Sequence, residues 1–340
     1  MGAVGTATRR AWDWSARPRL LEVSATATLV AMGVGIVSGG AVRLTGSGLG
    51  CSDWPTCTAT SVVAPLQFHA WVEFGNRLIT AAMTLGVVLV ALASLRRRPR
   101  RTDLVWLSWG LVAGIFGEVV LGGLTVLNKL APPFVMAHFL LGMVLVVNAA
   151  VLYGRCRAPD ALPGPGPATP GGRVRVRATP SHPLVRRGHL LAARAMLGWT
   201  FVVLVLGTVV TSTGPHAGAP GVPRFGFSLH TVAQLHGSSV ELLMAFTVAT
   251  LWSLHRARVP QVVFRRAEVL LVVMVSQAAV GYTQYFTGDP VLLVGVHLAG
   301  AATLVVAMVL FNMGLYVHEV PEQHQTVARE VPGQRELARA

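Results

Sequence analysis

The chain has 340 residues, of which 53% are hydrophobic and only 12% are charged, and its mean hydropathy is +0.58. Soluble globular domains carry about 25% charged residues, so this chain lacks the polar groups that a soluble surface needs, and its apolar content excludes intrinsic disorder. Its apolar runs reach the length of about 18 residues that a helix needs to cross a bilayer. The alternating segments of a membrane barrel are not seen. The composition therefore predicts an all-α integral membrane protein.

Eight membrane-spanning helices are predicted, and their order along the chain decides which loops share a side of the membrane. We expect them at 22–42, 70–95, 103–126, 133–153, 189–213, 230–254, 267–286 and 290–316. The loops on one side contain the basic residues Arg43, Lys129 and Arg224, whereas 24 of the 28 basic residues lie at the other side. Because positively charged loops stay in the cytoplasm, both termini are predicted to be cytoplasmic in a protein of the cell membrane. Topology thus accounts for the formal net charge of +14, and no nucleic-acid partner is expected.

Two of the three cysteines are predicted to form a disulfide. Cys51 and Cys57 lie six positions apart in the first external loop, whereas Cys156 lies at the cytoplasmic end of a span. Disulfides persist outside the reducing cytosol, so a bridge between Cys51 and Cys57 is the preferred prediction. Two free thiols are the alternative, and a metal site is disfavoured because no histidine lies between the two cysteines.

The chain is predicted to contain two similar halves of four helices each. The parts are a first half at 1–157, a flexible Pro-, Gly- and Arg-rich cytoplasmic linker at 158–188, a second half at 189–317 and a cytoplasmic tail at 318–340. One constant shift in residue number aligns Glu118 with Gln277 and His138 with His297. Because each half begins and ends in the cytoplasm, the repeats are parallel. We therefore expect two pseudo-symmetric four-helix bundles.

Charged and strongly polar side chains inside the spans are costly in lipid and therefore indicate function. The candidates are Glu73, Asn76, Arg77, Glu118, His138, His236, Glu241 and His297. His236 and His297 both lie about two turns inside the external ends of their helices, so they share one depth in one bundle. Two imidazoles that face each other across a four-helix bundle can bind a haem iron on both axial faces. The alternative is that both histidines only hydrogen-bond neighbouring helices.

The first half repeats this pattern with one gap. His138 is the counterpart of His297, but the counterpart of His236 in the second span is Asn76, and an amide is a poor iron ligand. The nearest other imidazole, His69, lies seven residues before Asn76, about 10 Å closer to the external surface. Either His69 reaches inward, or an iron in this half has His138 on one face and an open axial position, which can bind and activate O₂. The sequence leaves this choice open.

Four further charged side chains are candidates for a role at the first-half site. Glu73 either serves catalysis at a haem edge or forms a structural i, i+4 ion pair with Arg77. Glu118 is expected to bond one helix to another or to contact a haem propionate. Arg43 and Arg77, near the external face, are candidates for binding haem propionates, and Arg43 is alternatively an interfacial anchor.

Several of these residues lie in segments that resemble one known family. The external loop at 43–57 (RLTGSGLGCSDWPTC) resembles the loop motif of haem A synthases. The segment 73–77 (EFGNR) resembles the family's Glu-x-x-His-Arg segment, with Asn76 in place of the family's histidine, and 122–127 (GGLTVL) resembles the end of its third span. Together with the three intramembrane histidines, the resemblance covers all eight predicted spans but neither the termini nor the linker.

The resemblance implies an enzyme that oxidises the C8 methyl group of haem O to the formyl group of haem A for cytochrome oxidase assembly. It implies that His236 and His297 hold a haem b that relays electrons, that His138 holds the substrate haem and that Glu73 serves catalysis. The loop closed by the disulfide would shape the substrate side. Haem O synthase is the implied source of substrate, and a quinol or another membrane donor is the implied source of electrons. The oligomeric state, a homo-oligomer included, stays open.

Two other classes of membrane protein share some of these features. A dihaem electron-transfer protein of the cytochrome b type would keep both haems as permanent cofactors. A transporter would also combine parallel repeats with intramembrane carboxylates. Haem extracted from the purified protein separates these classes: haem O or A beside haem b indicates the synthase, haem b alone indicates the electron-transfer protein, and no haem absorption indicates the transporter.

Overall fold

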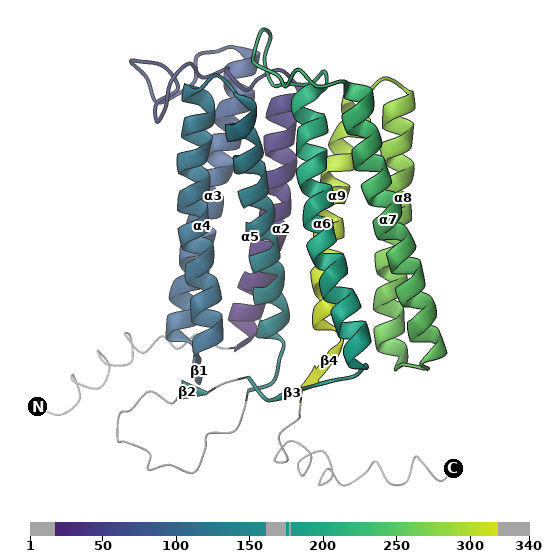
Figure 1. Cartoon of the computed structure of the whole chain (residues 1–340). Helices are drawn as coiled ribbons and strands as arrows, with labels where there is room; N and C mark the ends of the chain where they lie inside the picture. The colour runs from purple at the N-terminus through teal and green to yellow at the C-terminus, as the bar shows by residue number, and fades with distance from the viewer. Residues whose placement is uncertain (1–17, 161–174, 177, 319–340) are drawn as a thin grey trace, which may run out of the picture.

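The computed structural model describes residues 18–160, 175–176 and 178–318, and helices make up most of this part of the chain. The helices are α2 (Pro18–Leu44), α3 (Phe68–Arg96), α4 (Thr102–Leu127), α5 (Pro132–Cys156), α6 (Arg187–Thr213), α7 (Leu229–Arg256), α8 (Gln261–Phe286) and α9 (Val291–Met313). They stand side by side, so their ends form two opposite faces of the molecule (Figure 1). With 23 to 29 residues each, they are about 34 to 44 Å long, enough to cross a hydrocarbon core of about 30 Å.

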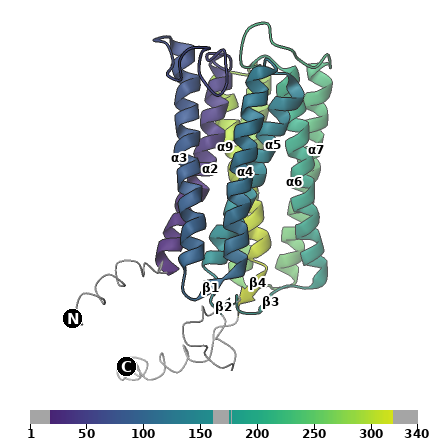
Figure 2. The same cartoon turned by 90° about the vertical axis from the view of Figure 1, so that its left-hand side faces the viewer.

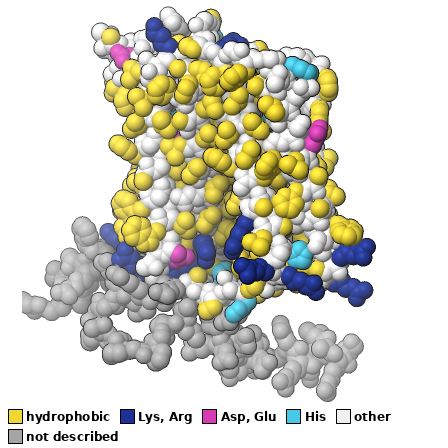
Figure 3. All heavy atoms as spheres, in the orientation of Figure 1, with side chains coloured by type: hydrophobic (Ala, Val, Ile, Leu, Met, Phe, Trp, Pro, Cys, Tyr) yellow, Lys and Arg dark blue, Asp and Glu magenta, His cyan; other side chains and the backbone are white. Residues whose placement is uncertain are grey.

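Seven of the eight helices in the described part of the chain are long and apolar enough to cross a membrane, and α8 is the exception. The predicted helix at 267–286 is present as α8, but Arg265, Arg266 and Glu268 lie near its beginning and Gln277 and Gln284 nearer its end. On the face seen in Figure 3, hydrophobic side chains cover the middle of the molecule, and most visible Lys and Arg side chains lie at the lower end. The chain is therefore an all-α, multi-pass membrane protein.

The ends of several helices follow from the local sequence. Proline begins α5 at Pro132 and directly precedes α8 and α9 at Pro260 and Pro290. At the first turn of a helix its missing N–H removes no helical hydrogen bond. Ser228 caps α7, because its side chain accepts a hydrogen bond from the backbone N–H of Thr231 at 3.5 Å.

Consecutive helices pack against each other in two groups. In the first group α2, α3, α4 and α5 contact one another in this order and α5 also contacts α2; in the second, α6 to α9 do the same and α9 contacts α6. The groups meet where α5 contacts α6 and α9 and where α2 contacts α9. They lie side by side in Figure 1, and Figure 2 shows the molecule from the side of α3 and α4.

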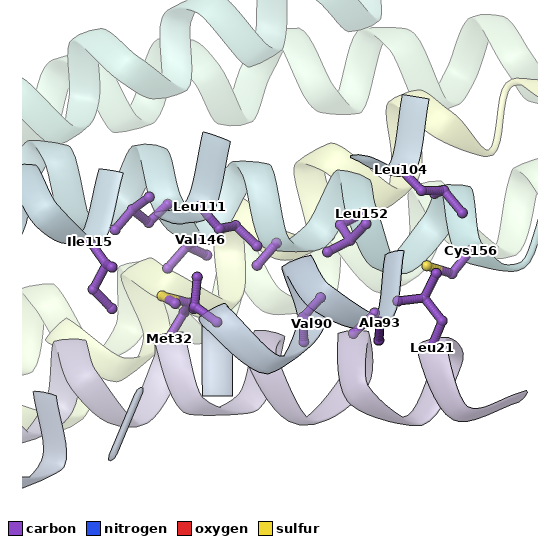
Figure 4. Packing of buried hydrophobic residues seen from close by; sticks show 14 of the residues in the cluster. Leu21, Met32, Val90, Ala93, Leu104, Leu111, Ile115, Val146, Leu152 and Cys156 are labelled. Atoms are coloured by element: carbon purple, nitrogen blue, oxygen red, sulfur yellow. The ribbon is translucent and has the colours of Figure 1, made fainter. Parts of the chain in front are cut away.

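Buried apolar side chains fill the space between the helices. In the first group they come from all four helices and include Leu21, Met32, Val90, Leu104, Leu111, Ile115, Val146 and Leu152 (Figure 4). A second cluster includes Met196, Leu243, Leu270, Met308 and Phe311. Trp106 and Phe116 of α4 instead point outward and are 77% and 71% exposed. In a membrane these outer side chains contact lipid tails, so exposing them costs little.

The turns between α4 and α5 and between α8 and α9 have similar backbone geometry. Lys129 and Leu130 have φ values of 51° and 59°, and Gly288 and Asp289, at the corresponding place in the second half, have 80° and 57°. The N–H of the second residue in each pair donates to the carbonyl oxygen five residues earlier, at 2.8 Å in both turns. The shift in residue number that aligns His138 with His297 also aligns these two turns. It therefore describes a repeated local structure as well as a repeated sequence.

Short strands and ion pairs join chain segments at the end of the molecule where α2 begins and α9 ends (Figure 1). The parallel pair is β1 (Arg100–Arg101) with β2 (Arg175–Val176), and the antiparallel pair is β3 (Ser181–Pro183) with β4 (Tyr316–His318). The buried guanidinium groups of Arg97 and Arg101 lie 3.0 and 3.6 Å from the carboxylate of Asp160, near the beginning of the predicted linker. Residues 161–174 of that linker and 319–340 of the predicted tail lie outside the described residues.

Glycine allows α4 and α5 to approach closely. Gly110, Gly114 and Gly117 recur at helical spacing on α4. A Cβ atom on Gly114 would lie 2.2 Å from Cδ2 of Leu145, and one on Gly110 would lie 2.9 Å from Nδ2 of Asn148, both on α5. Small residues at such positions increase the van der Waals contact that holds helices together in lipid.

Replacing Gly114 by valine is therefore expected to force α4 and α5 apart. We expect the free energy of unfolding to fall by about 1–3 kcal/mol, the usual cost of overpacking. Gly86→Val on α3 is the matched control, because nothing lies within 4 Å of a Cβ at Gly86. Thermal unfolding of both variants in detergent micelles measures the difference. Equal losses in the two variants would contradict close packing at Gly114.

Candidate functional site

His236 on α7 and His297 on α9 face each other inside the second group of helices. Their ring centroids are 6.4 Å apart and their planes differ by 75°. Nδ1 of His236 lies 3.2 Å from the backbone oxygen of Val203 on α6. A proton on Nδ1 makes this a hydrogen bond and leaves the Nε2 lone pair of His236 free. Nδ1 of His297 is buried, with no hydrogen-bond partner among the described residues.

A glycine on a neighbouring helix makes room for each of the three intramembrane histidines. A Cβ atom added at each glycine would lie close to Cε1 of one imidazole. The pairs are Gly207 on α6 with His236 (3.1 Å), Gly281 on α8 with His297 (3.0 Å) and Gly122 on α4 with His138 (3.4 Å). A methyl group at the first two positions would press on the ring. The sequence analysis did not predict these contacts. A signal for two of them was present, because the shift that aligns His138 with His297 also aligns Gly122 with Gly281.

The pair of imidazoles in the second group fits a haem iron. A metal bound to two imidazole nitrogens at about 2 Å each separates the ring centroids by about 6 Å, and the observed separation is 6.4 Å. Two imidazoles cannot complete the coordination of a metal, so this pair suits an iron whose other ligands come from a porphyrin. His236 and His297 are therefore the residues that would hold such a group.

The first group has a different set of polar contacts. Nδ1 of His138 on α5 lies 2.6 Å from Oε2 of Glu118 on α4. Asn76 on α3 accepts a hydrogen bond from the hydroxyl of Ser38 on α2 at 2.8 Å. His69 lies in the first turn of α3, and its Nδ1 lies 2.9 Å from the hydroxyl of Ser47. Within the described residues, neither Asn76 nor His69 has a hydrogen bond or ring contact to His138.

Cys51 and Cys57 form the predicted disulfide and are both fully buried. They close the segment 51–57, which we call the disulfide loop. Trp54 of this loop packs against α4, since a Cβ on Gly123 would lie 2.6 Å from the indole ring. Gly123 directly follows Gly122, the glycine against which the ring of His138 lies. The disulfide loop therefore contacts α4 next to the residue against which His138 lies.

Glu73 and Arg77 attach the disulfide loop to α3. The buried carboxylate of Glu73 accepts a hydrogen bond from the backbone N–H of Cys51 at 2.8 Å and one from Arg77 Nη2 at 2.7 Å. Arg77 also donates to the backbone oxygens of Asp53 and Thr56, at 3.0 and 2.9 Å. The i, i+4 ion pair considered in the sequence analysis is thus present, and it anchors the loop.

Arg43 joins the two groups of helices at the end of the molecule where α2 and α6 end. Its guanidinium group donates to the backbone oxygens of Thr211, in the last turn of α6, and His216, in the following loop. Arg43 and Arg77, predicted from sequence as partners of haem propionates, thus contact backbone carbonyl groups that the sequence did not predict.

Glu241 of α7 lies apart from the histidine pair. Its exposed carboxylate accepts a hydrogen bond from the hydroxyl of Tyr282 on α8. Both side chains face outward, and Tyr282 is 47% exposed. Of the three intramembrane glutamates proposed from sequence, Glu73 and Glu118 therefore lie inside the first group, and Glu241 lies on the outer surface of the second.

Comparison with known proteins relates most of the chain to one family. The family model of the cytochrome oxidase assembly proteins (COX15-CtaA) matches residues 63–309. A heme A synthase of Symbiobacterium thermophilum is 30% identical over 233 residues, which cover 64% of this chain and 74% of that protein. A heme A synthase of Methylobacterium sp. is 26% identical over 341 aligned positions, which cover 88% of this chain and 92% of that protein. The match with the heme A synthase of Geobacillus kaustophilus, 31% identical over 105 residues, spans 30% of this chain and 32% of that relative.

The anchoring of the disulfide loop by Glu73 leads to a test of its stability. Glu73→Ala removes the acceptor of the Cys51 N–H and the anion beside Arg77. Because a lost hydrogen bond to a charged group costs about 1.5 kcal/mol or more, we expect a water-soluble thiol to reduce the disulfide about tenfold faster. Mass spectrometry of alkylated cysteines measures the rate.

Two further variants separate the effects of charge and hydrogen bonding on this rate. Glu73→Gln keeps an oxygen for the Cys51 N–H and should give an intermediate rate, whereas Glu241→Ala, on the outer surface, should react as the unaltered protein does. Reduction of Glu73→Ala at the unaltered rate would show that Glu73 does not hold the loop.

Proposed function

The chain belongs to the haem A synthase family of cytochrome oxidase assembly proteins, and we propose that it oxidises the C8 methyl group of haem O to the formyl group of haem A. The observation that carries this proposal is the unequal distribution of imidazoles. His236 and His297 face each other in one group of helices, whereas His138 contacts a carboxylate in the other. An iron with two axial protein ligands transfers electrons, whereas an open axial position binds O₂. The two groups therefore suit a relay site and a reaction site.

We assign His236 and His297 to a resident haem b. When bound, this haem supplies one-electron transfer. The protein's part is to hold the two rings in place: the backbone oxygen of Val203 orients His236, and the backbone at Gly207 and Gly281 packs closely against the rings of His236 and His297. Second contacts of this kind fix the tautomer and the orientation of a ligating histidine.

We assign His138 to the substrate haem. Asn76 and His69 are engaged with Ser38 and Ser47, which supports an open axial position opposite His138 rather than a second imidazole. We assign to the disulfide loop, whose Trp54 packs on α4 at Gly123, the role of limiting the access of water to this site. Exclusion of water protects reactive intermediates and strengthens electrostatic interactions within a site.

The reaction balances as two hydroxylations followed by loss of water. Each hydroxylation consumes one O₂, two electrons and two protons, inserts one oxygen atom into a C–H bond of the methyl carbon and releases one water. The second hydroxylation gives a hydrated aldehyde, which loses water to leave the formyl group. We assign Glu73 to this site because its buried carboxylate holds the disulfide loop over it and offers a fixed negative charge on that side of the first group.

The membrane arrangement and the partners follow from the same proposal. We infer that residues 1–157 and 189–317 form two pseudo-symmetric four-helix bundles, which the alike turns and the repeated glycine–histidine pairs support. The basic end faces the cytoplasm of the cell membrane, with both termini there. Haem O synthase supplies the substrate, and a quinol or another membrane donor supplies electrons.

Single histidine variants test the assignment of the two sites. His236→Ala and His297→Ala should each retain at most about one tenth of the haem b that the unaltered protein binds, because a five-coordinate haem lacks half of its axial ligation. His138→Ala should keep haem b but form no haem A. His230→Ala is the matched control, since this histidine begins the same helix as His236 and its ring contacts Tyr285 at the surface. Absorption spectra and chromatography of extracted haem measure both outcomes.

The composition of the extracted haem decides between the candidate functions. Haem O or haem A beside haem b supports the synthase. Haem b alone at both sites would indicate a dihaem electron-transfer protein, and protein without haem absorption would overturn both assignments. Haem A formation by His138→Ala at the unaltered rate would remove His138 from the reaction site.

A further inference from the structure

Equivalent positions of the two halves place different polar groups beside the intramembrane histidines. Glu118 precedes His138 by the same number of positions as Gln277 precedes His297. Both pairs join neighbouring helices, α4 to α5 and α8 to α9. The residues at the first position of each pair differ by one group, a carboxylate against an amide. The two halves can therefore be compared directly, because equivalent histidines have different polar side chains beside them.

The carboxylate of Glu118 is placed on the ring of His138. Oε2 lies 2.6 Å from Nδ1, and the Glu118 side chain is only 14% exposed. The two atoms are at ion-pair distance but do not form a hydrogen bond, and among the described residues both Nδ1 of His138 and Oε1 of Glu118 are buried without a hydrogen-bond partner. The His138 ring on α5 is thus the partner of this carboxylate.

The second half has no such contact among its described residues. Nε2 of Gln277 donates to the backbone oxygen of His297 at 2.6 Å, not to its ring. Nδ1 of His297 is buried without a hydrogen-bond partner in the described ranges. The only acceptor beside the facing ring of His236, in the part of the chain that the structure describes, is the neutral backbone oxygen of Val203. Of these three imidazoles, His138 is therefore the one with an anionic neighbour.

A carboxylate that contacts the nitrogen not bound to the metal changes the properties of a histidine ligand. It fixes the proton on that nitrogen, leaves the other nitrogen to the metal and raises the basicity of the ligand. A more electron-donating axial ligand favours O–O cleavage, as the thiolate does in other haem proteins, and it stabilises the ferric state over the ferrous state. A neutral backbone oxygen does this less strongly.

We propose that Glu118 is a positioning residue that makes His138 a stronger electron donor to the substrate haem than His236 and His297 are to the resident haem. The inference rests on the proposed function, because it takes His138 as the ligand of the substrate haem. Glu118 acts through His138 and does not touch the reacting methyl group. The difference between Glu118 and Gln277 thereby assigns oxygen chemistry to the first half and electron relay to the second.

Glu118→Gln tests this proposal in full-length protein loaded with haem O. The first-half signal is identified as the one that His138→Ala removes. In a redox titration, we expect the ferrous-to-ferric ratio of that haem at a given potential to rise about tenfold, a shift in midpoint of about +59 mV for one electron. Resonance Raman spectra of the ferrous protein should show a lower iron–histidine stretching frequency. The resident haem should titrate as before.

Two matched variants guard against an indirect effect. Glu118→Asp keeps the charge but shortens its reach, so it should shift the potential in the same direction by less, and it provides the measurement if Glu118→Gln does not fold. Glu241→Gln makes the same chemical change at an intramembrane glutamate on the outer surface, and it should leave both potentials unchanged.

The outcomes separate the inference from the function on which it rests. An unshifted first-half potential and an unshifted stretching frequency in Glu118→Gln would overturn the role of Glu118 while leaving the function intact. A shift of the same size in Glu241→Gln would also overturn it. Unaltered protein that binds no haem O in the first half would instead overturn the proposed function.

Discussion

The close contact between a histidine ring and the backbone of a neighbouring helix is the constraint on which this protein's interior depends. Each of the three intramembrane imidazoles lies against a glycine, Gly122, Gly207 or Gly281. With no side chain at these positions, the ring can approach the backbone of the neighbouring helix closely. Since lipid tails do not hydrogen-bond, a polar ring there must find its partner inside the protein. The position of each glycine sets where a ring can approach a neighbouring helix, and this limits which groups can become its partner.

The same backbone pattern supports two different chemical environments. The turns before α5 and α9 are alike, and each leads into a helix with a histidine at an equivalent position. What differs is the partner of each ring: another imidazole for His297, and a carboxylate for His138. The repeated backbone therefore holds histidines at equivalent positions beside different polar groups, which is the basis of the roles proposed for the two halves.

The end of the molecule where α2 ends and α3 begins shows how charged groups are accommodated beside the apolar helices. Arg77 and Glu73 fix the disulfide loop to α3, and Arg43 links α2 to the end of α6. These groups satisfy backbone carbonyls and amides that no helix or sheet would otherwise pair. The disulfide loop is thus held to α3 by charged groups and closed by the Cys51–Cys57 bond.

The sequence by itself determined the class of protein, the positions of the helices, the disulfide partners and the histidines worth testing, because hydropathy and spacing are properties summed along the chain. Only the tertiary structure decided which polar groups meet. Arg43 contacts Thr211, 168 positions away, and Glu118 on α4 contacts the ring of His138 on α5. Such partners depend on the distance and rotation between helices, which side-chain packing sets and local sequence does not encode.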